Sequence, residues 1–222
     1  MPDFLVTGTD TGVGKTVIAA ALVKALRARG LRAIGFKPVE TGQDPGEVAD
    51  SEILAQASGD RTPLTQPLLH LAEPLAPAVA ADRAGAVLDP ADIEDRIDAL
   101  RAAGHALVVE GAGGLLVPLV WGYTALDLAA RKGLEAIVVG RAGLGTLNHF
   151  ALTVAVLRSR AVAVRGLVLN GRRDAGDLAE MTNPGALARL LPGVPFIVVP
   201  RHPTSVVAEA VDASVPFVAP LL

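Results

Sequence analysis

A glycine-rich stretch near the N-terminus, residues 8–16, constrains this chain more than any other feature. It follows a short apolar run, residues 4–6, and precedes an alanine-rich helical pattern at residues 17–29. In a strand–turn–helix setting of this kind, backbone N–H groups wrap around phosphate oxygens and the helix N-terminus adds a partial positive charge. Lys15 would reach the β- and γ-phosphates of a nucleotide, and the Thr16 hydroxyl would bind Mg²⁺. The stretch therefore predicts a nucleotide-phosphate loop.

The spacing within this loop departs from the usual pattern of glycine, four residues and Gly-Lys-Ser/Thr. Counting back from Gly14, the first-glycine position is Thr9, and Gly8 leaves a gap of five residues. The alternative is a glycine-rich turn that carries a Lys-Thr pair by chance. Because both a strand and a helix flank the stretch, we favour a variant phosphate-binding loop.

Short apolar runs alternate with helical patterns along the chain. The predicted strands are residues 4–6, 33–36, 106–109, 136–139, 164–169 and 196–199. The predicted helices are residues 17–29, 50–57, 90–102, 124–131, 148–159, 183–191 and 205–210. This alternation predicts an α/β fold with a doubly wound, mostly parallel sheet and helices on both faces, similar to P-loop nucleotide-hydrolysing proteins.

Two segments carry no clear periodicity. Residues 39–49 are interpreted as a loop, because Pro38 opposes continued strand pairing. Residues 61–79 contain four prolines and are interpreted as a long, partly irregular connection. No internal repeat or linker divides the chain, so we expect one domain that spans residues 1–222.

Composition narrows the function classes. Apolar residues make up 51% of the chain but aromatic residues only 3%, which suits strands buried on both faces. The net charge of −3, without a basic block, argues against nucleic acid as the main partner. The lack of cysteine excludes disulfides and zinc–thiolate sites. Because the sequence has neither a signal-peptide pattern nor a long apolar run, we expect a cytoplasmic protein without membrane attachment.

Polar residues follow the predicted strands. In a doubly wound sheet, ligands bind beyond the carboxyl ends of the strands. Lys37 and Thr41 follow the second strand, Glu110 the third, a Gly-Leu-Gly loop at residues 143–145 the fourth, Asn170 the fifth, and Pro200, Arg201 and His202 the last. We therefore expect these groups to converge on one edge of the sheet.

The residue types at this edge suit phosphoryl chemistry. Glu110 can bind Mg²⁺ directly or through water, and Asp50 can supply a second carboxylate or simply cap the following helix. Lys15 and Lys37 would present two cations to one phosphate region, where charge spreads over phosphoryl oxygens. The alternatives are a solvated or capping acid at Glu110 and a snorkelling lysine at Lys37. Asn170 suits either a hydrogen bond to adenine or an Asn-Gly turn.

Four motifs together resemble the dethiobiotin synthetase family. They are residues 8–16 with the same five-residue gap, Lys-Pro-Val at 37–39, Val-Glu-Gly-Ala-Gly-Gly at 109–114 and Leu-Gly-Thr-Leu-Asn-His at 144–149. The resemblance implies an ATP-dependent enzyme of biotin synthesis that closes a ring on 7,8-diaminopelargonic acid. One amine takes up CO₂ as a carbamate, the carbamate attacks the γ-phosphate, and the second amine displaces phosphate from the mixed anhydride.

The resemblance also assigns residues, one by one. It implies that Lys15 and Lys37 are catalytic and that Thr16, Asp50 and Glu110 bind Mg²⁺. It implies substrate contacts at Thr11, Lys37, Thr41, Gly111, Leu144, Gly145 and Asn148. It implies ATP contacts at Gly12, Val13, Gly14, Lys15, Thr16, Val17, Asp50, Glu110, Gly111, Ala112, Gly113, Asn170, Gly171, Pro200, Arg201 and His202. It further implies a homodimer in which residues 144–148 help to hold the carboxylate tail of the substrate across the subunit interface.

The chain departs from the family at Gly12, where some members carry glutamate, and at Gly143, where some carry lysine; Arg141 lies nearby. Two other classes compete with this interpretation. Related amidotransferase-type ligases for cobalamin precursors carry a glutaminase domain with a nucleophilic cysteine, which this chain lacks. Partitioning-type ATPases usually carry an extra lysine early in the phosphate loop, where this chain has Thr9, Asp10 and Thr11.

Overall fold

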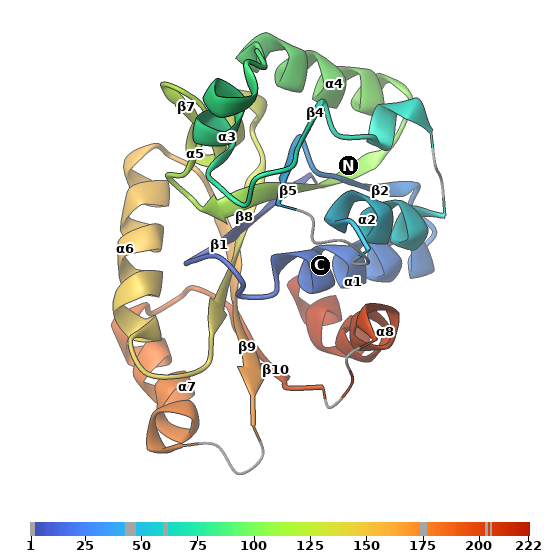
Figure 1. The fold of residues 1–222 in the computed structure, drawn as a ribbon. Coiled ribbons are helices and arrows are strands. Elements are labelled where there is room, and N and C mark those ends of the chain that lie inside the picture. Colours follow the sequence, from blue (N-terminus) through green and yellow to red (C-terminus); the bar gives the residue numbers. More distant parts are fainter. Residues whose placement is uncertain (1–2, 43–47, 60–61, 174–176, 203, 205) are drawn as a thin grey trace.

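Six parallel strands form the central sheet of this protein (Figure 1). The computed structural model describes residues 3–42, 48–59, 62–173, 177–202, 204 and 206–222. The strand order is β10-β9-β8-β1-β5-β2, which places β1 in the middle of the sheet. The strands are β1 (Phe4–Gly8), β2 (Ala33–Phe36), β5 (Ala106–Gly114), β8 (Glu135–Arg141), β9 (Val164–Arg172) and β10 (Phe196–Pro200).

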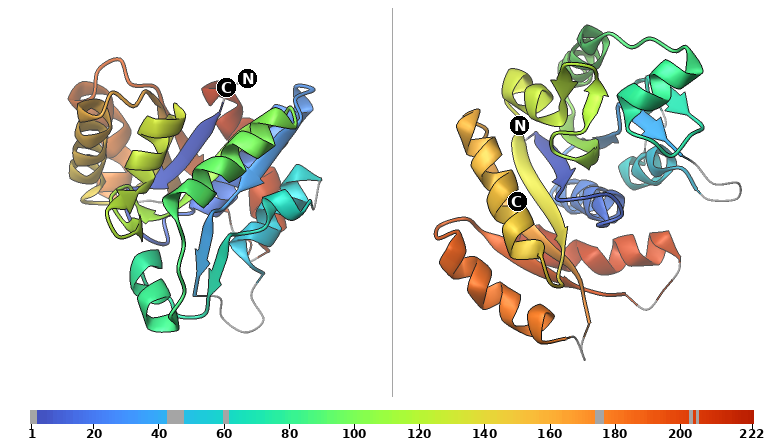
Figure 2. Two further views of the ribbon diagram at one scale, coloured as in Figure 1. Left: turned by 90° about the horizontal axis from the view of Figure 1, so that it is seen from above. Right: turned by 60° about the vertical axis from the view of Figure 1, so that its left-hand side comes forward.

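Helices cover both faces of the sheet (Figures 1 and 2). One face carries α1 (Lys15–Ala28), α2 (Asp50–Ser58) and α8 (Val207–Val218), followed by a 3₁₀ turn, η2 (Ala219–Leu221). The other face carries α4 (Pro90–Ala102), α5 (Ala125–Lys132), α6 (Thr146–Ser159) and α7 (Leu178–Leu190). The predicted doubly wound α/β fold is confirmed.

Side-chain alternation along the strands produces two separate cores. In β1, Leu5 packs into the core beneath α4 to α7, whereas Phe4 and Val6 pack into the core beneath α1, α2 and α8. All three side chains are buried. A strand buried on both faces therefore has a continuous apolar sequence, which is why periodicity of two is absent from these runs.

The predicted loop at residues 39–49 is wrong in its first part. Residues Val39–Thr41 form β3, which pairs in parallel with β4 (Leu69–Leu71). Pro38 lacks only its own N–H donor, and its carbonyl accepts a hydrogen bond from the Leu68 N–H at 2.8 Å. The proline therefore leaves the next three residues able to pair. Residues 43–47 of the predicted loop lie outside the described residues.

The segment at residues 61–79 is more regular than its prolines indicate. It contains a 3₁₀ turn, η1 (Pro63–Thr65), then β4, and the start of α3 (Pro77–Ala84). Arg96 of α4 donates hydrogen bonds to the carbonyls of Pro63, Leu64 and Gln66, at 3.0–3.2 Å. Pro77 occupies the first turn of α3, where a missing N–H costs nothing.

Other boundaries also differ from the sequence prediction. A small antiparallel hairpin of β6 (Pro118–Val120) and β7 (Tyr123–Thr124) was not predicted. Helix α8 extends to Val218 rather than to residue 210. Helix α7 begins at Leu178 rather than at residue 183, because the Asp177 side chain accepts a hydrogen bond from the Glu180 N–H and caps the helix there.

Among the described residues, the helices lack the length and apolarity that a membrane crossing requires.

Asn183 holds a loop rather than starting a helix. Its buried side-chain amide donates to the carbonyls of Ala142 and Gly143, at 2.7 and 3.0 Å. We expect Asn183→Ala to lower the free energy of unfolding by about 1–3 kcal/mol, because it removes the partner of buried carbonyls. Urea unfolding measures this difference. The control is Gln66→Ala, at an exposed amide, and equal stability of the two variants would contradict the expectation.

Candidate active site

The turn between β1 and α1 has the backbone shape of a phosphate-binding loop. Gly12 and Gly14 adopt left-handed conformations with φ of 67° and 90°, which residues with a Cβ rarely adopt. Alternation of left- and right-handed residues turns successive N–H groups toward one point. Lys15 begins α1 and is largely buried, and its Nζ lies 3.4 Å from the Asp10 carbonyl oxygen.

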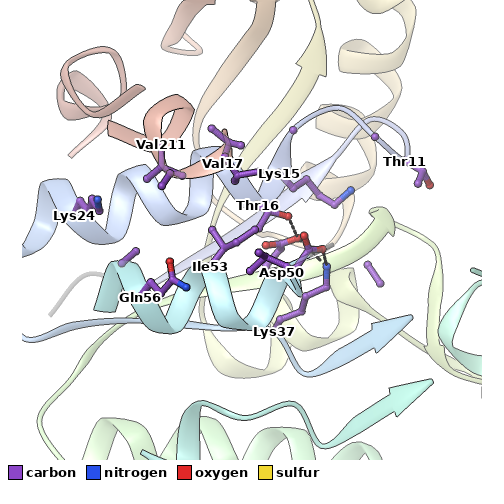
Figure 3. Close-up of a pocket in the computed structure, with 18 of the residues that line it drawn as sticks. Thr11, Lys15, Thr16, Val17, Lys24, Lys37, Asp50, Ile53, Gln56 and Val211 are labelled. Carbon is purple, nitrogen blue, oxygen red and sulfur yellow. Dashed lines mark hydrogen bonds and ion pairs between the residues drawn. The ribbon is translucent and has the colours of Figure 1, made fainter. Parts of the chain in front are cut away.

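Lys37 belongs to a cluster of charged side chains that come from different helices and strands (Figure 3). Its Nζ forms ion pairs with Asp50, the first residue of α2, and with Glu110 Oε1 at 3.1 Å. The Thr16 hydroxyl, in the first turn of α1, donates to the same Glu110 oxygen at 2.9 Å. Strand register explains this convergence, because Phe36 of β2 lies opposite Val109 of β5.

Burial controls the charges in this cluster. Desolvation raises the pKa of Glu110, which is 1% exposed, while the Lys37 ammonium opposes that rise. Desolvation also acts against the charged form of Lys37, but the Glu110 and Asp50 carboxylates outweigh it and raise its pKa above the ordinary value. Burial lowers the pKa of Lys15, with Glu110 opposing and Lys37 assisting. Lys37 is therefore held as a desolvated cation.

The donor set at this cluster fits a magnesium ion that is shared with a nucleotide. Glu110 Oε2 is buried and has no hydrogen-bond partner among the residues that the structure describes, so one carboxylate oxygen is available to a cation. Thr16 and Asp50 add a hydroxyl and a second carboxylate, the oxygen ligands that Mg²⁺ combines with water and phosphate. The described residues include no group of three or more His, Cys, Asp or Glu side chains that would hold a metal alone.

The loop and the charged cluster face one cavity of about 830 Å³. The predicted site residues that line it are Thr11, Gly12, Gly14, Lys15, Thr16, Val17, Lys37, Thr41, Asp50, Glu110, Ala112 and Gly113. The cavity extends between α1, α2 and α8, where its walls include Ile53, Ala57 and Val211 (Figure 3). The sequence analysis missed this apolar extension, although Ile53 and Ala57 share one face of α2 by helical spacing.

Several predicted site residues do not line this cavity. They are Val13, Gly111, Leu144, Gly145, Asn148, Asn170, Gly171, Pro200, Arg201 and His202. Val13, within the loop, has a buried side chain, and its carbonyl accepts a hydrogen bond from the Asn170 amide at 2.8 Å. His202 Nε2 lies 3.2 Å from the Ser214 hydroxyl of α8. Leu144 is 93% exposed and precedes Gly145, the N-cap of α6.

Glu40 is a supporting residue that the sequence analysis missed. It is buried in β3, and its carboxylate accepts hydrogen bonds from the Ser51 hydroxyl at 2.5 Å and the Ser51 N–H at 3.4 Å. Ala49 occupies the N-cap of α2 and offers no side-chain acceptor. Glu40 therefore caps α2 from another element and fixes the helix end that carries Asp50. No short-range sequence signal reveals a cap supplied from a distant strand.

Comparison with known proteins agrees with this geometry. A family model described as an AAA domain matches residues 3–209. The chain is 48% identical to the ATP-dependent dethiobiotin synthetase of Anaeromyxobacter sp. (strain K), over 91% of this chain and 92% of that protein. It is 44% identical to the enzymes of the same name from Haloferax mediterranei, over 89% and 83%, and from Mycobacterium leprae (strain Br4923), over 85% and 83%.

Solved structures show the same fold at lower identity. The septum site-determining protein MinD of Pyrococcus horikoshii, in complex with Mg-ADP, is 21% identical with a TM-score of 0.61, over 95% of this chain and 86% of that chain. The cell division ATPase MinD of Pyrococcus furiosus is 20% identical with a TM-score of 0.61, over the full length of both. These likenesses concern the fold alone.

The comparisons confirm the resemblance that the four sequence motifs indicated. The family model matches residues 3–209, a range that includes both the phosphate loop and the strand ends that follow it. The chain belongs to the ATP-dependent dethiobiotin synthetase family and is an ATP-dependent ligase.

Proposed function

We propose that this protein makes dethiobiotin, in the cytoplasm and for biotin synthesis, from 7,8-diaminopelargonic acid, CO₂ and ATP. The observation that carries the proposal is the convergence of Lys15 and Thr16 of α1, Lys37 after β2 and Glu110 of β5 on one cavity at the carboxyl edge of the sheet. Family membership supports the reaction, and the cavity offers space for a triphosphate beside a second small molecule.

The proposed reaction has three steps. One amine of the substrate adds to CO₂, forming an N–C bond and releasing a proton, which gives a carbamate. A carbamate oxygen then attacks the γ-phosphorus of ATP, and the bond to the ADP oxygen breaks. The second amine attacks the carbonyl carbon of this mixed anhydride, the C–O bond to phosphate breaks, and the amine loses a proton as the ring closes.

The side chains supply charge and position rather than covalent chemistry. Phosphoryl transfer passes through a state in which negative charge spreads over the phosphoryl oxygens, so preorganised cations accelerate it. We assign this role to Lys15 at the loop and Lys37 at the end of β2, where burial strengthens their electrostatic effect. Magnesium, held by Thr16, Asp50 and Glu110, would neutralise phosphate charge during the transfer.

Further residues are assigned to the diamine and to the carboxylate tail of the same substrate. Thr11 and Thr41 line the cavity and are proposed to contact the diamine, together with Gly111. We propose a homodimer in which residues 144–148 hold the carboxylate tail of the substrate bound to the partner subunit. The 93% exposure of Leu144 supports this, since a partner would cover it.

The adenine end of ATP is assigned to the carboxyl ends of β9 and β10. Gly171 and residues 200–202 lie there. The side-chain amide of Asn170, on the same strand end, contacts the phosphate loop at Val13 instead. Val17, in the first turn of α1, lines the adjoining part of the cavity.

Phosphate release from ATP, with dethiobiotin measured by mass spectrometry, tests the proposal. We expect release to require both 7,8-diaminopelargonic acid and bicarbonate, with one phosphate for each ring formed. The comparison variant is Lys132→Ala, whose lysine pairs with Asp98 on the opposite face of the sheet and should leave the rate unchanged. ATP hydrolysis that proceeds at full rate without the diamine would favour a switch-type ATPase and refute the proposal.

A further inference from the structure

We propose that Arg141 and Asn170 together form a brace that holds the phosphate loop in its nucleotide-binding shape. Both are positioning residues, which act on the loop backbone from outside the cavity. The inference rests on the proposed role of the loop in binding ATP, and it assigns to these two side chains a function separate from contact with the nucleotide.

The brace consists of two hydrogen bonds from neighbouring strand ends. Arg141, at the end of β8, and Asn170, near the end of β9, are partners in the parallel register of these strands. Arg141 Nη2 donates to the Thr11 carbonyl at 3.0 Å, and Asn170 Nδ2 donates to the Val13 carbonyl at 2.8 Å. Two donors fixed by one pair of strands therefore bind two loop carbonyls that are two residues apart.

These carbonyls are the ones that the loop conformation turns outward. When left-handed residues alternate with ordinary ones, N–H groups converge on an anion and the intervening carbonyls point away from it. Gly12 and Gly14 are the left-handed residues, and each directly follows a residue whose carbonyl is braced. A donor at each carbonyl stabilises the arrangement that points the N–H groups inward.

The packing around the glycines supports the same role. A Cβ added to Gly14 would overlap Asn170 Nδ2, so the amide lies directly against the loop backbone. A Cβ added to Gly12 would lie 3.8 Å from Arg141 Nη2. Both glycines line the cavity, whereas Arg141 and Asn170 do not. The two side chains thus contact the loop backbone without lining this cavity.

Binding of inorganic tripolyphosphate separates a brace from recognition of adenine. We expect Asn170→Ala and Arg141→Met each to weaken binding of Mg-ATP and of Mg-tripolyphosphate by the same factor, about 3- to 10-fold, as for a lost hydrogen bond. Calorimetric titration of the full chain measures both ligands. The matched controls are Gln66→Ala, a surface amide, and Arg158→Met, an exposed arginine of α6; neither should change binding.

A second measurement reports on the loop itself. Amide hydrogen exchange of residues 8–16 should accelerate in both brace variants, while exchange in the core strands and in α6 stays as in the unmodified protein. A general loss of folding would accelerate exchange everywhere and would overturn the proposal as stated. Unchanged loop exchange would also overturn it.

Two further binding results would refute the brace. If Asn170→Ala weakened ATP but not tripolyphosphate, the amide would act on adenine alone. If Arg141→Met left the affinity for both ligands unchanged, the guanidinium would not hold the loop in its nucleotide-binding conformation. Failure of the proposed function would look different, because the unmodified protein would then bind tripolyphosphate, with the expected losses in both variants, and yet form no dethiobiotin.

Discussion

Replacement of Lys37 by alanine is expected to lower turnover by on the order of 10²-fold or more, as for other groups that stabilise transition-state charge. Lys37 is desolvated and kept charged by Glu110 and Asp50, so it can stabilise a transferring phosphoryl group more strongly than an exposed lysine would. Steady-state phosphate release at saturating ATP and diamine measures the effect. A rate equal to that of the unmodified protein would remove Lys37 from the mechanism.

Loss of folding must be separated from loss of catalysis in this variant. Lys37→Ala leaves the Glu110 carboxylate buried without its cation, which lowers stability. The double variant Lys37→Ala/Glu110→Gln removes that uncompensated charge and should unfold at higher temperature than the single variant. At saturating Mg²⁺ its turnover should stay far below that of Glu110→Gln alone, because the missing ammonium is not restored. Turnover equal to that of Glu110→Gln alone would show that Lys37 matters only for stability.

Glu110→Gln is expected to raise the Mg²⁺ concentration for half-maximal activity by at least about 10-fold, as loss of groups around a metal does. Glutamine keeps the shape of the side chain and an acceptor for the Thr16 hydroxyl, but it lacks the negative charge that a cation requires. Magnesium titrations of phosphate release measure the shift. In excess chelator, the unmodified protein should release no phosphate.

The control for this experiment is Glu73→Gln, at an exposed carboxylate that pairs with Arg83 outside the cavity. It should leave the magnesium requirement unchanged. An equal shift in both variants would indicate a general effect of surface charge. Full activity of the unmodified protein in excess chelator would contradict the assignment of Thr16, Asp50 and Glu110 to the metal.

The parts of this site that the sequence predicted are those fixed by strand direction. Once the sheet is parallel, residues that follow each strand meet at one edge, and register alone brings Lys37 beside Glu110. The phosphate loop was predictable for a similar reason, because its glycines, Lys15 and Thr16 form one continuous stretch. The fold class followed from the alternation of apolar runs and helices.

The parts that the sequence did not predict depend on contacts between distant segments. The pairing of β3 with β4 joins residues about thirty positions apart, and Pro38 gave a local signal against it. Asn183 looks like a helix start beside Pro184, yet its amide holds the carbonyls of a loop forty residues away. The bond from Asn170 to the phosphate loop was unexpected for the same reason. Such polar contacts leave no periodic pattern in the chain.

We propose that these strand ends gather around one magnesium-bound triphosphate next to a carbamylated diamine. The direct measurement is a crystal structure with a non-hydrolysable ATP analogue, Mn²⁺ in place of Mg²⁺, and 7,8-diaminopelargonic acid. We expect the triphosphate within the turn at Gly12 and Gly14, an anomalous manganese peak in contact with Thr16 and Glu110, and an amine next to Lys37. A triphosphate bound elsewhere, or manganese remote from Glu110, would contradict this proposal.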